Sequence, residues 1–143
     1  MNNGFRTYNV ELDFEQTAMI ESEVSFKQYD YGTCTVMAKL TKGGATITLT
    51  DNDIVVAVFK NKKGDIITDN RSKAIKSKAI VKSSEEGIIE VPIPKEILKE
   101  KGKVSSELVF IAKDKSYRRT SPAFIFFIIE SLIDFDDLLL EEE

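Results

Sequence analysis

The sequence predicts an all-β protein, an antiparallel, Ig-like β-sandwich with one short helix. An acidic tail follows at the C-terminus, and a helix is one of the two conformations that we consider for it. Apolar residues recur with a period of two along most of the chain, which is typical of strands. About eight such segments alternate with turn signals, the pattern of a sandwich. The chain has 143 residues, of which 42% are hydrophobic, so it is large enough for one domain with a core.

Five predicted strands occupy the first sixty residues. They cover residues 7–14, 23–26, 33–40, 47–49 and 54–59. In the third segment every second residue from Cys34 to Leu40 is apolar, so Cys34, Val36, Ala38 and Leu40 are expected on one buried face. The fifth segment is rich in β-branched residues and ends at a turn over residues 62–65.

Three further regions of strand follow. Residues 79–81 and 88–91 flank the turn sequence 83–87, which predicts a hairpin with a five-residue loop. Residues 107–112 form the next strand, with a turn at 113–116. The apolar run 123–129 is too short for a membrane-spanning helix, which needs about 20 residues, so we expect a buried strand over 124–129 and no membrane partner.

One helix is predicted between the hairpin and the strand at 107–112. Pro94 suits a first helical position and Gly102 a C-terminal stop, with residues 95–101 between them. Ile97 and Leu98 are expected to pack downward while the charged residues face water. Because so short a helix is unstable alone, it must pack on the sheets.

The charge of the chain is unevenly distributed. Residues 130–143 carry seven acids and no base, so residues 1–129 hold 17 acids (24 − 7) and all 20 bases, a net charge of +3. The densest basic stretch runs from Lys60 to Lys82 and contains no aromatic residue between these two lysines. A nucleic-acid site usually interleaves aromatic residues for stacking, so an edge-protecting segment is favoured and no nucleic-acid partner is expected.

This asymmetry divides the chain into a sandwich over residues 1–129 and a tail over 130–143. Ser131 and Asp134 resemble a helix-capping pair. Leu132, Phe135, Leu138 and Leu139 fall near one helical face. The tail is therefore either a frayed terminus or a helix that docks onto a basic partner or begins a longer assembly helix.

Composition excludes several kinds of chemistry. The chain has no His and one Cys, so a His-dependent triad, a His-ligated metal site and an internal disulfide are impossible. Nucleotide-binding motifs are absent, and the DND sequence at 51–53 lacks the Gly and Glu of a calcium loop. An acidic catalytic pair is compatible with 24 acids, but no pair stands out. We therefore expect no catalytic, metal-binding or cofactor-binding residues and no enzymatic activity.

Four regions of the chain together resemble the N-terminal domain of phage baseplate upper proteins, the BppU family. One has an acidic-x-Gly-Thr start, DYGT at 30–33, and a strand ending in a Lys-x-Gly turn, KGG at 42–44. The four regions are 30–36 with 39–44, 47–50 with 56–60 and 63–65, 87–94 with 97–98 and 102–104, and 108–111 with 119–126. The resemblance spans roughly residues 20–129, and it depends on the order and spacing of all four regions.

The resemblance implies a structural role in the virion, at the tail baseplate, for a protein made in the bacterial cytoplasm. Family members dock onto the central baseplate hub, the distal tail protein, and longer ones continue through a linker helix into a trimeric stem that presents receptor-binding proteins. The implied partners are thus the hub, the receptor-binding proteins and other copies of the chain. This sequence ends at Glu143 without a stem, so it is either one domain taken from a longer protein or a short member of the family. The resemblance then implies that the tail is the beginning of the linker.

Candidate partner contacts lie at both ends of the chain. The N-terminal segment could add a strand to a neighbour, and the tail offers an apolar helical face. The candidates are Phe5, Tyr8, Val10, Leu12, Phe14, Leu132, Phe135, Leu138 and Leu139. The alternative function is a sandwich module that binds host-surface carbohydrate. It would depend on Tyr29 and Tyr31, because the chain has no Trp for a sugar platform.

Overall fold

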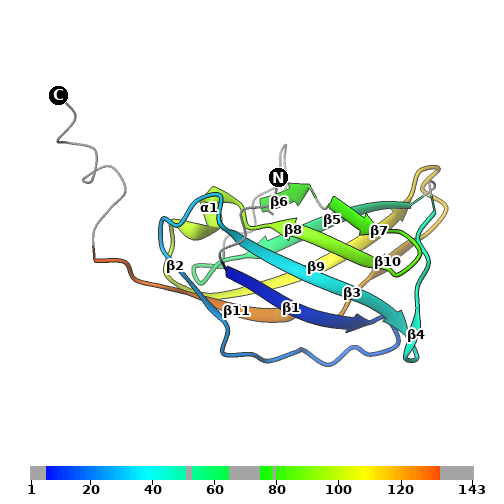
Figure 1. The fold of residues 1–143 in the computed structure, drawn as a ribbon, viewed down its shortest axis with the longest axis horizontal. Helices are drawn as coiled ribbons and strands as arrows, with labels where there is room; N and C mark the ends of the chain where they lie inside the picture. Colours follow the sequence, from blue (N-terminus) through cyan, green and yellow to red (C-terminus); the bar gives the residue numbers. More distant parts are fainter. Residues whose placement is uncertain (1–5, 51–52, 65–74, 79, 133–143) are drawn as a thin grey trace.

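A computed structural model describes residues 6–50, 53–64, 75–78 and 80–132. Within these residues the chain forms strands and one helical turn, so the prediction of an all-β protein is confirmed (Figure 1). In chain order the elements are β1 (Arg6–Asp13), β2 (Ser25–Lys27), β3 (Cys34–Lys42), β4 (Ala45–Thr46), β5 (Asp53–Lys60), β6 (Ile75–Lys78), β7 (Ile80–Ser83), β8 (Ile88–Pro92), α1 (Lys95–Leu98), β9 (Gly102–Ala112), β10 (Arg118–Thr120) and β11 (Phe124–Ile129).

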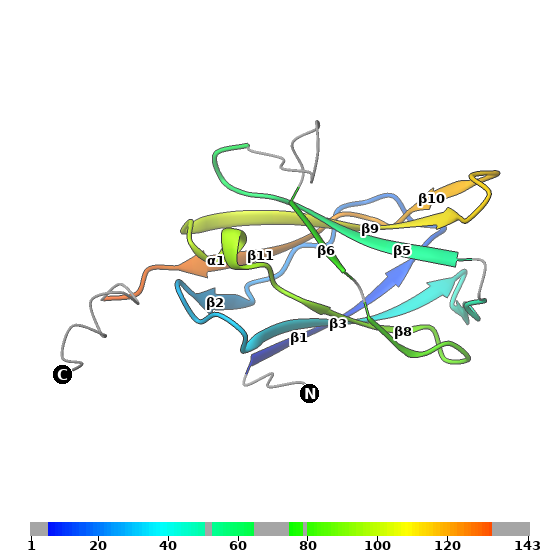
Figure 2. The ribbon, with the colours of Figure 1, turned by 90° about the horizontal axis from the view of Figure 1, so that it is seen from above.

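The strands form two sheets, seen edge-on as two layers in Figure 2. The five-stranded sheet has the order β1-β3-β8-β7, with β4 paired to β3. The six-stranded sheet has the order β2-β11-β9-β5-β6, with β10 paired to β9. The chain passes from one sheet to the other between β6 and β7, which are the last strands of their sheets. The Lys-rich stretch therefore ends on an edge strand, as predicted.

Both sheets are mixed, which corrects the prediction of a wholly antiparallel arrangement. β1 pairs with β3 in parallel, Arg6 opposite Cys34, and β2 pairs with β11 in parallel, Ser25 opposite Phe127. The reason is connectivity. Between β1 and β3 the chain crosses to the other sheet, forms β2 there and returns, so β3 enters the five-stranded sheet in the same direction as β1.

One core lies between the sheets, built from alternate residues of both. In β3 the predicted face of Cys34, Val36, Ala38 and Leu40 is buried, as expected. The six-stranded sheet contributes Phe26, Phe59, Phe124 and Phe126, which are among the largest fully buried side chains. The Tyr8 ring contacts Phe124 and Phe126 edge to face, with centroids 6.1 and 6.4 Å apart, so β1 lies over β11.

The helix is shorter than predicted. It is one turn, Lys95–Leu98, with Pro94 at the N-cap and Lys99 at the C-cap. Gly102 does not merely end the helix: it is the first residue of β9, opposite Ile128 of β11. Pairing with β11 therefore draws the chain into the sheet soon after the first turn. The predicted packing is confirmed, because Ile97 and Leu98 are completely buried.

Several strand boundaries also differ from prediction. A short strand forms at Ala45–Thr46 rather than at 47–49, because the Gly43–Gly44 turn folds the chain back on β3 at once. β9 starts five residues before the predicted 107, and β6 and β10 were not predicted at all. The predicted hairpin is present as β7 and β8, with a register shift between Val81 and Ser83. The strand at 124–129 matches β11.

Candidate interaction surfaces

The outer edge of β1 is the first candidate surface. Arg6 N–H donates to Thr33 O (3.2 Å) and Phe14 N–H to Thr41 O (2.8 Å), eight residues apart on each strand. Because hydrogen bonding alternates along a parallel strand, the even-numbered residues of β1 direct their backbone groups at β3. Thr7, Asn9 and Glu11 direct theirs away from β3, and all three residues are exposed.

The predicted contact side chains on this strand are not those of an exposed surface. Tyr8 is 5% exposed and Leu12 is fully buried, because both lie on the face that packs over β11. Both are core residues in this fold, and their role as partner contacts stays a prediction. Val10 and Phe14 are partly buried and pack against the same core. The feature that β1 can offer a partner is its backbone edge.

Asp13, at the end of β1, binds the turn between β3 and β4. Its Oδ1 accepts from Glu15 N–H (2.9 Å) and Gly43 N–H (3.0 Å), and its Oδ2 accepts from Gly44 N–H (2.8 Å) and Thr41 Oγ1 (3.0 Å). The backbone N–H groups of Glu15, Gly43 and Gly44 lower the pKa of Asp13 to about 2. This carboxylate therefore holds the start of the β1–β2 connection against the turn.

A shallow hollow of about 340 Å³ lies on the outer face of the five-stranded sheet, beside the edge of β1. Residues of β1, β3 and β8 line it: Asn9, Val10, Glu11, Met37, Ala38, Lys39 and Ile88. Glu11 and Lys39 are opposite each other in register, so acidic and basic groups both flank the hollow. It is an open surface feature and not an enclosed ligand cavity.

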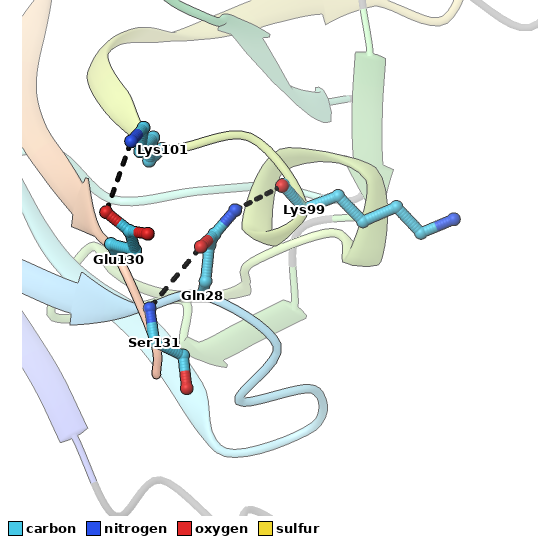
Figure 3. A network of polar contacts seen from close by, with 5 residues as sticks. All are labelled: Gln28, Lys99, Lys101, Glu130 and Ser131. Carbon is cyan, nitrogen blue, oxygen red and sulfur yellow. Dashed lines mark hydrogen bonds and ion pairs between the residues drawn. The ribbon is translucent and has the colours of Figure 1, made fainter. Parts of the chain in front are cut away.

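The second candidate surface is the point where the C-terminal segment leaves the domain (Figure 3). Gln28, just after β2, bridges two other parts of the chain. Its Nε2 donates to Lys99 O at the end of α1 (2.7 Å), and its Oε1 accepts from Ser131 N–H (3.3 Å). Nearby, Lys101 Nζ lies 3.2 Å from Glu130 Oε1. These contacts attach the departing segment to α1 and β2.

The sequence did not predict Gln28 as a functional residue. Its position directly after β2 is the only sequence feature that pointed to it. Leu132, a predicted contact, is fully exposed just beyond this network. Phe135, Leu138 and Leu139, like Phe5 at the other end, lie outside the described residues. The predicted tail helix also lies outside them, so its conformation stays a prediction.

Tyr29 and Tyr31, the residues of the carbohydrate alternative, do not form an open platform. They lie in the turn after β2, where their rings meet edge to face with centroids 6.3 Å apart. Lys95 Nζ lies 5.3 Å from the centre of the Tyr31 ring. Tyr31 also packs against the core. A sugar ring would need a free flat face, which this arrangement does not favour.

The described residues carry little that could support catalysis or metal binding. No group of three or more His, Cys, Asp or Glu side chains is placed to hold a metal ion within the described ranges. Cys34 is 4% exposed, and burial raises the pKa of its thiol, which disfavours a nucleophilic thiolate. In the same part of the chain, no helix has the length and apolar character needed to cross a membrane.

Two mixed sheets around one core, with candidate interaction surfaces at the edge of β1 and at the exit of the C-terminal segment, define an all-β domain. The BppU N-terminal domain model matches residues 6–142, and the chain belongs to this family, the N-terminal domain of phage baseplate upper proteins. It is thus a structural domain of a phage tail baseplate, and its place is the virion tail.

One solved structure supports the fold. The N-terminal domain of phage TP901-1 ORF48 matches with a TM-score of 0.65 at 8% identity, over 85% of this chain and 97% of that one. A family 123 glycoside hydrolase from Clostridium perfringens matches with a TM-score of only 0.34 at 13% identity, over 87% of this chain and 23% of that one. No curated protein matches the sequence. The Ig-like detail of the predicted sandwich stays a prediction.

Proposed function

We propose that this domain docks onto the central hub of the baseplate and helps to anchor the receptor-binding proteins, and that its role is structural and not catalytic. The observation that carries the proposal is the family match over residues 6–142, which includes nearly all of the acidic tail. Residues 1–129 then form the docking domain, and residues 130–143 begin the connection to the rest of the assembly.

The contacts at the exit of the tail support this division. A segment that transmits position from the hub to a receptor-binding protein must leave its domain from a defined point. Gln28 ties Ser131 to the end of α1, and Lys101 pairs with Glu130. The two connections end at Glu130 and Ser131, next to a fully exposed Leu132, so the side chain of Leu132 is available to a partner where the tail leaves the domain.

Co-elution with the cognate hub protein tests the docking. Purified chain and hub are mixed and separated by size exclusion with light scattering, which also reports any homo-oligomer. We expect one complex that contains both proteins, and we expect the chain in purified tails. Folded protein that neither co-elutes with the hub nor occurs in tails would overturn the proposal.

A truncation tests the role of the tail. A chain ending at Glu130 should keep its fold and its binding to the hub, because the described core lies before that residue. It should no longer retain the receptor-binding proteins in a pull-down. It should also no longer form any trimer that depends on the tail. Retention of these proteins by the truncated chain would show that the tail is not the connection.

A further inference from the structure

The two sheets end differently on the side of β1. β1 is the last strand of the five-stranded sheet and lies over β11, as the contacts of Tyr8 with Phe124 and Phe126 show. The six-stranded sheet continues beyond β11 through β2 and the residues before it. The path of the five-stranded sheet therefore has one strand fewer on this side, and no strand of the described residues pairs with the outer edge of β1.

The residues before β2 extend the six-stranded sheet beyond β11; we call residues 19–24 the ledge. The ledge is bound to β11, because Ile20 N–H donates to Ala123 O (2.8 Å), Ile125 N–H to Ile20 O (3.1 Å) and Phe127 N–H to Val24 O (3.0 Å). Figure 1 shows the connection from β1 to β2 passing along the side of β1 that faces away from β3. A strand added to β1 would lie over this ledge.

The ledge offers apolar surface to such a strand. Met19 is 48% exposed, and Ile20 and Val24 are only partly buried at the margin of the core. In a strand, alternate side chains point to opposite faces. An added strand with alternating residues could therefore place its apolar side chains over the ledge while its other side chains face solvent.

The charge around the outer edge of β1 and the ledge indicates which kind of segment would bind there. From Thr7 to Phe26 the sequence contains five acids and no Lys or Arg. Four of the acids, Glu11, Glu15, Glu21 and Glu23, are exposed. A basic segment would be attracted to this side, whereas a second copy of β1 would bring a second set of the same acids. A second copy would also bring its own ledge into the same space, since each six-stranded sheet extends past its β1.

The other ends of the sheets are built differently. β7 has a register shift, and β6 lies in the Lys-rich stretch. Irregular pairing and Lys are both devices that discourage strand addition. β1 pairs with β3 through all eight of its residues without a shift, and it presents the outward N–H and C=O groups of Thr7, Asn9 and Glu11.

We propose that the outer edge of β1 receives an extended, basic segment of the hub protein, with alternating apolar residues, as an added strand of the five-stranded sheet. The identity of the partner rests on the proposed function. The affinity comes from backbone pairing with Thr7, Asn9 and Glu11, and the specificity comes from the acidic, partly apolar ledge.

Asn9 allows backbone pairing to be separated from side-chain contact. Asn9→Pro removes an N–H that points away from β3, and Pro is tolerated on edge strands. Asn9→Ala removes the side chain and keeps the N–H. We expect Asn9→Pro to weaken hub binding by about tenfold or more, and Asn9→Ala by less than about twofold, in a calorimetric titration.

Charge reversal tests the ledge. Glu21→Lys with Glu23→Lys should weaken hub binding by about tenfold at low salt, with a smaller effect at high salt. Glu85→Lys with Glu86→Lys is the matched control, because these two acids are exposed in the β7–β8 loop, away from β1. Equal loss from both pairs would indicate a general charge effect and overturn the assignment of the ledge.

Amide exchange on the wild-type protein requires no substitution. In the free protein the amides of Asn9 and Glu11 should exchange faster than those of Tyr8 and Val10, which are bonded to β3. On addition of the hub, Asn9 and Glu11 should become protected. Hub binding without this protection, or with full affinity in a folded Asn9→Pro, would overturn the edge assignment while leaving the proposed function intact.

Two other outcomes are decisive. If the wild-type chain does not bind the hub, the proposed function fails and the assignment of the edge fails with it. If the chain instead associates with itself and Asn9→Pro abolishes that association, the occupant is a second copy, and the proposal of a hub segment is wrong.

Discussion

Gly87, immediately before β8, occupies a position that only glycine fits. Its φ is +65°, and a Cβ there would lie 2.5 Å from Ile47 O and 3.0 Å from Leu40 O, both backbone atoms. We expect Gly87→Ala to lower the free energy of unfolding by at least about 2 kcal/mol in urea denaturation.

Gly44→Ala is the matched control for this prediction. Gly44 also has a positive φ, +85°, but no heavy atom of the described residues lies within 4 Å of the added Cβ. It should cost only the backbone strain, about 1 kcal/mol. Equal losses at the two glycines would mean that the close approach of Ile47 and Leu40 to Gly87 has no energetic weight.

Asp13 is the residue whose ionisation should affect stability most directly. Its pKa is about 2 in the folded protein, below the ordinary 3.8, so folding favours the charged form. A depressed pKa gives stability that is fully present above the ordinary value and is lost as the pH falls through about 2. We expect Asp13→Asn to melt at a lower temperature than wild type at pH 7, because one amide oxygen cannot accept all four hydrogen bonds.

The pH dependence of that difference distinguishes this carboxylate from the other acids of the chain. The gap in melting temperature between wild type and Asp13→Asn should shrink between pH 4 and pH 2, as protonation removes the same interaction from the wild type. Circular dichroism melts across this range measure it. A gap that is constant with pH would indicate that the charge of Asp13 contributes nothing.

At the scale of elements, β7 and β8 are joined by an unusual pair. Glu90 is 4% exposed, and its Oε1 lies 3.4 Å from Lys82 Nζ, whose side chain is 47% exposed. Its other oxygen, Oε2, is buried and has no hydrogen-bond partner among the described residues. A buried carboxylate with only partial compensation is costly to the fold.

A double-mutant cycle tests this reading. Lys82→Met leaves the buried carboxylate without its cation, so we expect a loss of roughly 1–2 kcal/mol, reduced because Lys82 is half exposed. Adding Glu90→Met should restore stability to the wild-type level or above it. A double variant as unstable as Lys82→Met alone would contradict the account. The measurement is urea denaturation of all four proteins.

At the scale of the whole molecule, stability depends on side chains that join the two sheets. Phe126 of β11 is fully buried, and its ring contacts those of Tyr8 in the other sheet and of Phe26 and Phe59 in its own. We expect Phe126→Ala to cost about 3–5 kcal/mol, which should leave the domain near the limit of folding.

Ile129→Ala is the comparison within the same strand. Ile129 is 41% exposed, so its truncation should cost below about 1 kcal/mol. Urea denaturation followed by circular dichroism measures both variants. Similar costs at Phe126 and Ile129 would mean that the contact between the sheets is not where the stability resides.

The sequence predicted the strands that have a clear apolar pattern, but it did not predict short polar strands or the pairing between strands. Alternation identified the strand containing Ala38 and the buried face of β3, because burial on one face imposes a period of two. β-Branched content identified the strand containing Ala57, and a continuous apolar run identified the strand containing Phe126. It could not identify β6 or β10, which are three or four residues long and polar. The helix was overextended because the pairing of Gly102 with Ile128 is not a local property.

The candidate surfaces were predicted less well than the fold. The N-terminal segment was correctly predicted to be a strand, but its pattern did not show that Tyr8 and Leu12, two of the predicted partner contacts, lie in the core. The roles of Asp13 and Gln28 each depend on residues about 30 to 100 positions away, such as Gly43 and Ser131. No local pattern contains that information.

The sequence by itself determined that this is an all-β domain and that His-dependent chemistry is impossible. It also determined, through the alternation of apolar residues, which side chains of a strand share a face. Only the tertiary structure decided that β1 pairs with β3 in parallel, that Tyr8 and Leu12 face inward, and that the backbone groups of Asn9 point outward. The physical reason is that alternation assigns side chains to two faces without saying which face is buried or which strand lies alongside. Those choices are made when non-local strands pair, and they place β1 at an edge of its sheet.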